Sequence, residues 1–258
     1  MITYKLLDRY NEIAHFCTTR QGGTSVGNYA SFNLSPFAGD KTNAFTANLN
    51  KLENILAINS SKIIIPFQTH GTEIKEIDAD FFKLTDDKKS EYLYAVDGIF
   101  TRIPKVCVGV TTADCVPLLF YNPTKQIIAA VHAGWRGTCG RIAEKTISAL
   151  VETYNCKPED IIVTIGPSIS VLMYEVKQDV IDNFDKAGFN TAEIVEKRNG
   201  ALFLDLWKAN IQSLLKAGVL SENIEVAGIC TYTDNELFFS ARKLGIKSGR
   251  MLSGIMLK

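Results

Sequence analysis

The segment TCGRIAEKTISALVETYNCKPEDIIVTI, residues 138–165, is the part of the sequence that decides the fold class. Its first half places Ile142, Thr146 and Leu150 on one face of a helix, and its end, 161–165, is a β-branched run typical of a buried strand. The segment therefore predicts a helix over 138–154 followed by a strand over 161–165.

The same helix-then-strand order is expected twice more along the chain. A helix at 44–57 precedes a strand at 62–67, and a helix at 203–217 precedes a strand at 224–229. A fourth helix is expected at 176–187, with Gly188 placed to end it. Further strands are expected at 13–19, 95–101, 105–111 and 126–132.

Two local features complete the expected architecture. The short gap containing Pro104 predicts that 95–101 and 105–111 form a hairpin, and the polar stretch 84–91 predicts an exposed loop. No linker or low-complexity segment divides the chain. We therefore expect a single domain, residues 1–258, of the α+β (α/β sandwich) class, with a mixed β-sheet and flanking helices.

Composition excludes several classes of function. The 258 residues include 28 Lys plus Arg and 28 Asp plus Glu, so the formal net charge is zero and a nucleic-acid partner is not expected. No apolar run is long enough for a membrane span, and the first residues do not resemble a secretion signal. The six cysteines have no regular spacing, which predicts reduced thiols in a cytoplasmic protein.

Three rare side chains carry the strongest chemical signal. His70, Cys115 and His132 each end or follow a strand-like run, and they converge if those strands are neighbours. Two imidazoles and one thiolate are a catalytic zinc set that leaves a fourth position open for an activated water. Gln68, Asp114 or a backbone carbonyl could orient the imidazoles.

Spacing alone does not decide this interpretation. The separations of 45 residues (70 to 115) and 17 residues (115 to 132) match no zinc-finger pattern. Taken singly, each residue fits a satisfied core histidine or an inert buried thiol equally well.

Three glycine- or aromatic-rich segments supply candidate substrate contacts. Residues 18–25, continuing to Asn33, contain Arg20, and 132–137 contain Trp135 and Arg136. Either arginine could hold a phosphate or carboxylate, although a solvated Arg20 in a tight turn and a core Trp135 are the plainer alternatives. The segment 238–242, with Arg250 nearby, has adjacent aromatic residues, which are more typical of core than of a cofactor site.

The motifs together resemble a known family. The matching segments, in order, are Thr18-Thr19-Arg20-x-Gly22-Gly23, Gln68-x-His70-Gly71, Asp97-Gly98, Thr112-Ala113-Asp114-Cys115-Val116-Pro117, His132-Ala133-Gly134-Trp135-Arg136-Gly137, Ile165-Gly166-Pro167, Tyr174-Glu175-Val176 and Phe238-Phe239-Ser240-x-Arg242. They resemble the YfiH-type family, also called the laccase-domain or polyphenol-oxidase family, from about residue 13 to the C-terminus.

The resemblance implies a single α/β domain and a zinc ion held by His70, Cys115 and His132. It implies catalytic roles for these three residues and Asp114. The substrate-binding residues it implies are Arg20, Asn33, Gln68, Arg136, Ser240 and Arg242. Many members have cysteines where this chain has Leu172 and Met173, so no thiol function is expected there.

Family members carry several functional names, and these give three hypotheses for the function of this chain. The first is a zinc-dependent purine nucleoside phosphorylase or adenosine deaminase acting on adenosine, inosine or methylthioadenosine, with phosphate as co-substrate. Asp114 or Glu175 would then transfer protons, and Arg20, Arg136 or Arg242 would bind phosphate. The second is an amide hydrolase acting on peptidoglycan precursors, either zinc-dependent or with Cys115 as nucleophile and His132 or His70 as base.

The third reading is a copper-dependent polyphenol oxidoreductase. Three histidines are too few for a multicopper centre, whereas a single His₂Cys copper site is compatible with the sequence. Zinc is therefore the expected metal, and copper is the alternative. A non-enzymatic binding protein is disfavoured because the polar residues gather at strand ends and glycine turns.

Overall fold

Three strands whose residues are all buried form the centre of the molecule. The computed structural model describes all residues, 1–258, and places β5 (Cys107–Thr112), β6 (Val116–Asn122) and β7 (Ile127–Ala133) in the core. Their sequences are nearly continuous apolar runs, as expected for strands that are covered on both faces.

These strands belong to two large sheets, and a third sheet is small. The six-stranded sheet has the order β12-β8-β6-β7-β4-β3, the four-stranded sheet β1-β13-β5-β2, and the three-stranded sheet β10-β11-β9. The remaining strands are β1 (Ile13–Cys17), β2 (Ile63–Ile64), β3 (Ile74–Glu76), β4 (Gly98–Thr101), β8 (Ile162–Ile165), β9 (Glu175–Val176), β10 (Val195–Arg198), β11 (Ala201–Leu204), β12 (Ile224–Val226) and β13 (Met251–Leu257). Parallel pairs (β12 with β8, β3 with β4) and antiparallel pairs occur in the same sheet, so the sheet is mixed.

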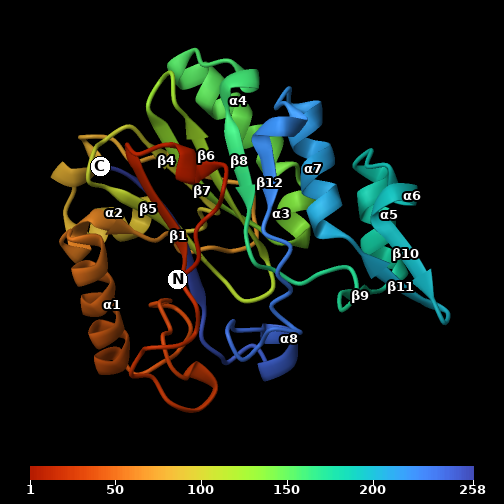
Figure 1. Cartoon of the computed structure of the whole chain (residues 1–258), viewed down its shortest axis with the longest axis horizontal. Helices are drawn as coiled ribbons and strands as arrows, with labels where there is room; N and C mark the ends of the chain where they lie inside the picture. The colour runs from red at the N-terminus through yellow and green to blue at the C-terminus, as the bar shows by residue number, and fades with distance from the viewer.

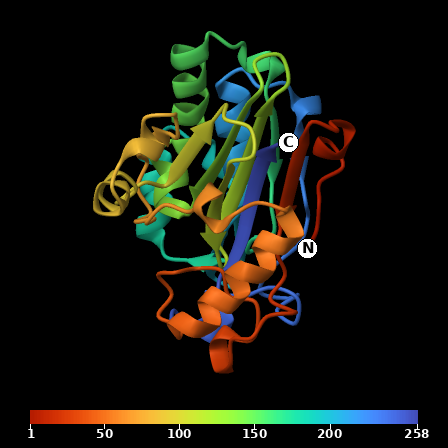
Figure 2. The same cartoon turned by 90° about the vertical axis from the view of Figure 1, so that its left-hand side faces the viewer.

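Helices cover the outer faces of the two large sheets. These outer faces are covered by α1 (Thr42–Leu56) on the four-stranded sheet and by α4 (Ile142–Tyr154) and α7 (Leu206–Lys216) on the six-stranded sheet. The other helices are α2 (Asp86–Tyr92), α3 (Trp135–Cys139), α5 (Gln178–Lys186), α6 (Thr191–Ile194) and α8 (Ala241–Leu244). Figure 1 shows α4 and α7 at the top and right of the strands and α1 at the lower left, and Figure 2 shows α1 in front of the lower ends of the strands.

Three apolar clusters hold these layers together. Val110 of β5 and Ile255 of β13 pack with Leu119 of β6 between the two large sheets. On the outer face of the six-stranded sheet, residues such as Phe120 pack with α4 and α7, and on the outer face of the four-stranded sheet Leu252 packs with α1. Each fully buried aliphatic side chain contributes about 1.5–3 kcal/mol to stability.

The structure confirms the α+β class and the predicted helices. In α4, Ile142, Thr146, Ile147 and Leu150 are buried at helical spacing, and the helix ends at Asn155, which has a left-handed φ of 51°. The helix expected at 203–217 begins later, at Leu206, because 201–204 pairs with its neighbours as β11.

Two local predictions are wrong. The runs 95–101 and 105–111 form no hairpin, since β4 pairs with β3 and β7 whereas β5 pairs with β13 and β2. Lys105 turns the chain with φ 59° and donates its backbone N–H to Leu257, which directs the second run into the other sheet. The polar stretch 84–91 contains α2, which is capped by Thr85 and polar because it is exposed.

None of the helices has the length and apolar character needed to cross a membrane.

Candidate metal centre

The chain brings its three candidate ligands together where it passes from one large sheet to the other. β5 lies in the four-stranded sheet and β6 in the six-stranded sheet, so Cys115 stands at the crossing. Antiparallel pairing places Val116 opposite Ala133, which sets Cys115 beside His132 at the end of β7. β2 pairs in parallel with β5, so the segment after β2 carries His70 to the same end.

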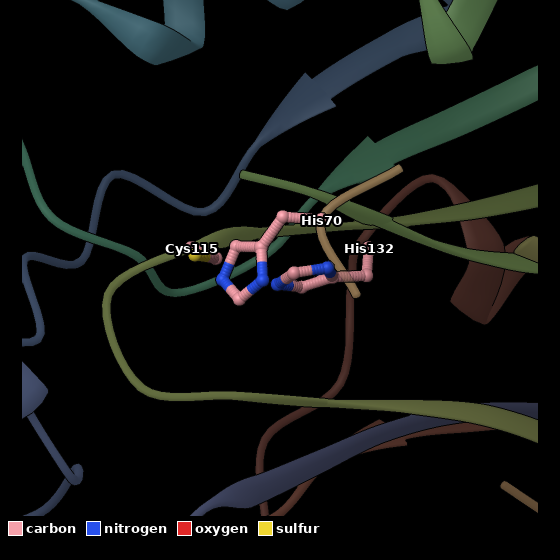
Figure 3. A group of neighbouring side chains, drawn as sticks. All are labelled: His70, Cys115 and His132. Atoms are coloured by element: carbon pink, nitrogen blue, oxygen red, sulfur yellow. The ribbon is translucent and has the colours of Figure 1, made fainter. Parts of the chain in front are cut away.

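The ligand atoms of His70, Cys115 and His132 all lie within 4.8 Å of one another. The two imidazole rings are 4.8 Å apart between centroids and inclined by 81°, as Figure 3 shows with Cys115 beside them. The expected convergence is therefore realised in the fold. One sulfur and two imidazole nitrogens match the donor set of a catalytic zinc site, so these residues could hold such an ion.

A buried carboxylate that sequence reasoning did not assign as orienting group fixes two of the three ligands. Oδ1 of Asp97 lies 2.8 Å from Nδ1 of His132. The same carboxylate accepts the backbone N–H groups of Thr69, His70 and Gly71 at 2.8–3.1 Å. His132 is thereby left with Nε2 for a metal. The signal in the sequence was an acid inside the apolar run 95–101, because a buried carboxylate needs partners.

The backbone at His70 and at Gly134 is constrained by the candidate metal centre. His70 has a left-handed φ of 64°, a conformation uncommon outside glycine, and its N–H is held by Asp97. At Gly134 a Cβ atom would meet Cδ2 of His70 at 3.0 Å and Sγ of Cys115 at 3.1 Å. Only glycine therefore fits beside the two ligands without displacing one of them.

Without a metal ion, Cys115 and His132 favour a thiolate and a protonated imidazole. Burial would raise the pKa of the Cys115 thiol, but the charge and hydrogen bonds of His132 and His70 outweigh burial and lower it to about 6. Burial would likewise lower the pKa of His132, but the Cys115 thiolate and Asp97 raise it to about 9. The pKa of Asp97 falls below its ordinary value because His132 and backbone N–H groups outweigh its burial.

A cavity of about 310 Å³ opens from the centre. His70, Cys115 and His132 line it, and so does Gln68, whose side-chain amide exchanges two hydrogen bonds with the backbone of Thr111 at 2.8 and 2.9 Å. The predicted substrate residue Gln68 thus lies at the cavity, clamped to β5.

Arg250 is the cation of this cavity; the sequence analysis placed it beside the 238–242 segment but gave it no role. Its guanidinium donates to the backbone carbonyls of Ser248, Gly249 and Ile246, and no carboxylate lies within ion-pairing distance. Burial lowers its pKa, and the charges of Cys115 and Asp114 oppose that effect. Nothing in the local sequence distinguishes Arg250 from an ordinary surface arginine.

Asp114 lies next to Cys115 but its carboxylate faces the protein. Oδ1 accepts the hydroxyl of Thr231 and Oδ2 accepts the backbone N–H of Arg242, both at 2.7 Å. Its φ of 89° gives the crossing its sharp turn. Asp114 thus joins the crossing to α8, with each carboxylate oxygen already bonded.

The other predicted substrate residues do not line the cavity. Arg20 donates to the carbonyls of Ala30 and Asn235 and lies 4.9 Å from the ring of Phe239. Asn33 is buried and bonded to Ser35, Asp40 and the backbone N–H of Arg250, and Ser240 caps α8 by accepting from Lys243.

Arg136 and Arg242 do not line the metal cavity, and both act on Tyr174. Arg136 is exposed and stacks on Trp135 at 4.3 Å, while Arg242 stacks on Tyr174 at 5.3 Å and donates to the Glu175 carbonyl. Burial raises the pKa of Tyr174, and both arginines counteract that rise, so the two cations flank one phenol.

A family model described as multi-copper polyphenol oxidoreductase laccase matches residues 14–258. The chain belongs to this laccase-domain family. The laccase-domain resemblance seen in the sequence motifs is thereby confirmed.

Relatives with curated names are similar over nearly the whole chain. A protein of Bacteroides thetaiotaomicron named purine nucleoside phosphorylase is 42% identical, covering 100% of this chain and 96% of the relative. A protein from an unknown prokaryotic organism named adenosine deaminase RL5 is 36% identical over 94% of this chain and 93% of the relative. The crystal structure of YlmD from Geobacillus stearothermophilus is 31% identical with a TM-score of 0.89, covering 96% of this laccase-domain chain and 93% of YlmD.

Proposed function

We propose that this chain is a zinc-dependent enzyme of purine nucleoside breakdown, acting as a purine nucleoside phosphorylase and able to deaminate adenosine. The observation that carries the proposal is the His70, Cys115 and His132 cluster opening into a cavity that also holds the cation of Arg250. Relatives named purine nucleoside phosphorylase and adenosine deaminase, 42% and 36% identical, support the substrate class. The six cysteines are all free, which suits a reducing, cytoplasmic setting.

The residues divide the chemistry between them. Zinc held by His70, Cys115 and His132 would supply Lewis acidity and an activated water. In phosphorolysis a phosphate oxygen forms a bond to C1′ as the glycosidic C–N bond breaks, giving the base and ribose 1-phosphate. In deamination water replaces the amino group of adenosine and ammonia leaves. Arg250 would hold the anionic phosphate, and Asp97 keeps His132 and the His70 loop in position.

The choice of zinc over copper rests on the ligands present. A mononuclear blue-copper site adds a weak axial Met, Gln or backbone oxygen. No methionine lines the cavity, and the amide of Gln68, which does line it, is bonded at both ends to the backbone of Thr111. The third histidine, His15, is in β1, bonded to Asp8 and stacked on Tyr4, so it supplies no second centre. Metal analysis of protein produced without added copper tests this; copper at full occupancy with a blue colour overturns it.

A chromatographic assay of adenosine with and without phosphate tests the activity. Adenine and ribose 1-phosphate that appear only with phosphate indicate phosphorolysis, and inosine indicates deamination. The proposal fails if the zinc-loaded protein forms none of these products from adenosine, inosine or methylthioadenosine.

A second candidate is a cysteine-dependent amide hydrolase acting on peptidoglycan precursors. The observation that favours it is the chain of contacts from Cys115 through His132 to Asp97, in which the pKa of the thiol is lowered to about 6 and that of the imidazole raised to about 9. Zinc ligation and nucleophilic attack compete for the same thiolate. Stoichiometric alkylation of Cys115 in metal-free protein as purified, with hydrolysis of a muropeptide, would favour the hydrolase.

A further inference from the structure

Three aromatic rings form an exposed cluster at the mouth of the metal cavity. Phe67 is the middle ring: it forms a T-shaped pair with Phe37, with centroids 4.8 Å apart and an angle of 77°, and lies nearly parallel to Tyr94 at 5.2 Å and 12°. Phe37 is 50% exposed and Tyr94 is 64% exposed. A contiguous exposed aromatic patch marks a binding surface more often than a packing defect.

The cluster joins two cavities. Phe37 and Phe67 line the metal cavity, and both also line a neighbouring cavity of about 390 Å³ bounded by Ile65, Leu93 and Tyr94. The rings therefore stand between the metal centre and an apolar compartment beside α2. A ligand that fills the metal cavity can therefore contact Phe37 and Phe67 as well as the metal ligands.

The middle ring is held in place before any ligand arrives. The backbone N–H of Phe67 donates to the carbonyl of Leu93 at 2.9 Å. The next residue, Gln68, is clamped to Thr111 through both ends of its amide. A fixed ring loses little conformational entropy on binding, which favours recognition of a flat partner.

We propose that Phe37 and Phe67 form the subsite that stacks against the heteroaromatic base of the substrate. This inference rests on the proposed nucleoside function and adds where the base lies. The cavity offers two contrasting parts: Arg250 and the metal ligands for anionic and reacting groups, and the aromatic rings for a flat, weakly polar ring system. A purine joined to a sugar carries both chemistries in one molecule.

The experiment separates ring stacking from simple apolar contact. The variants are Phe67→Leu, Phe67→Tyr and Phe37→Leu, with Phe82→Leu as matched control, since Phe82 lies beside Lys62 and lines neither cavity. The readouts are zinc content, KM and kcat for adenosine, and binding of unsubstituted purine by saturation-transfer NMR. Unsubstituted purine has no sugar to transfer and no amino group to lose.

We expect both leucine variants to raise KM for adenosine about 3- to 10-fold with unchanged kcat and zinc content, and to weaken purine binding equally. Phe67→Tyr keeps an aromatic ring, so its KM should rise less than that of Phe67→Leu, and Phe82→Leu should behave as wild type. Phe37 is half-exposed, so Phe37→Leu tests the subsite even if a change at Phe67 disturbs the fold.

Two results would overturn the subsite. The first is that the leucine variants retain zinc and bind purine as tightly as Phe82→Leu does, while the wild-type protein still turns over nucleosides. The other is equal loss in Phe67→Leu and Phe67→Tyr, which would indicate shape-filling rather than stacking. Failure of wild type to turn over any nucleoside while still binding purine through Phe67 would remove the proposed function and leave the stacking site standing.

Discussion

Oδ1 of Asp97 lies 2.8 Å from Nδ1 of His132, and the same oxygen accepts the backbone N–H of His70 at 2.9 Å. One buried carboxylate therefore orients one ligand through its ring and another through its main chain. Metal affinity should depend on this residue almost as strongly as on the ligands themselves.

Asp97→Asn should lower zinc affinity by about 10- to 100-fold, because an amide cannot match the charge that holds His132 and must present an N–H₂ group to one of the backbone donors. Competition with a chromophoric chelator measures the change. Asp87→Asn, at an exposed position on α2, is the matched control. Wild-type affinity in Asp97→Asn would contradict the positioning role.

Cys115→Ala should lose zinc and activity together, because two imidazoles alone form an incomplete site. Cys139→Ala removes a half-buried thiol on α3 and should keep both. Elemental analysis of the two purified proteins checks this. Full zinc content in Cys115→Ala would mean that the ligand assignment is wrong.

The Cys115 thiol should titrate far below an ordinary thiol in metal-free protein. Its pKa is lowered from 9.0 to about 6, so the thiolate is present at neutral pH and is lost as the pH falls through about 6. The ultraviolet difference spectrum of wild type minus Cys115→Ala follows this step. A midpoint near that of an ordinary thiol would show that His132 and His70 do not act on the sulfur.

Gly134→Ala should reduce zinc occupancy without abolishing folding. The added methyl group would meet His70 at 3.0 Å and Cys115 at 3.1 Å, so one of these ligands has to move. Gly134 has an ordinary φ of −65°, so a methyl group there adds contacts but no backbone strain. Gly200→Ala is the opposite case, since that glycine has open space around it but a φ of 81°. Zinc content and circular dichroism separate loss of metal from loss of fold.

Arg250→Lys should raise KM for phosphate by about tenfold or more while zinc content stays unchanged, because a lysine cannot reproduce the guanidinium geometry. Arg20→Lys serves as control: Arg20 holds the carbonyls of Ala30 and Asn235 and does not line the cavity. Phosphate dependence of phosphorolysis provides the measurement. A larger effect at Arg20 than at Arg250 would reverse the assignment.

The sequence predicted the helices α1, α4, α5 and α7 because their apolar residues recur at helical spacing, and the strands β5 and β7 because they are short apolar runs. β6 escaped prediction because Pro117 interrupts its run, although the Pro117 carbonyl still accepts the N–H of Gly166. β13 contains Ser253 and Gly254, and Gly254 is required by a close approach to Phe16, which no local pattern reveals.

The candidate site divides in the same way. His70, Cys115 and His132 could be selected because imidazoles and reactive thiols are scarce and stand at strand ends. Asp97 and Arg250 could not be assigned, because their roles arise from partners far away in the chain. Asn33 and Ser240 were predicted as substrate-binding residues from the motifs. In the structure Asn33 accepts the backbone N–H of Arg250 and Ser240 caps α8, so a motif residue can have a structural role.

The crossing from β5 to β6 at Cys115 has a consequence for how the protein matures. The three candidate ligands lie on the segment after β2, on the link between the two large sheets, and near the end of β7. They therefore come together only once the two sheets have docked. Binding of the proposed zinc ion should therefore follow docking of the two sheets, and a chain with misdocked sheets should lack the stabilisation that the ion would give.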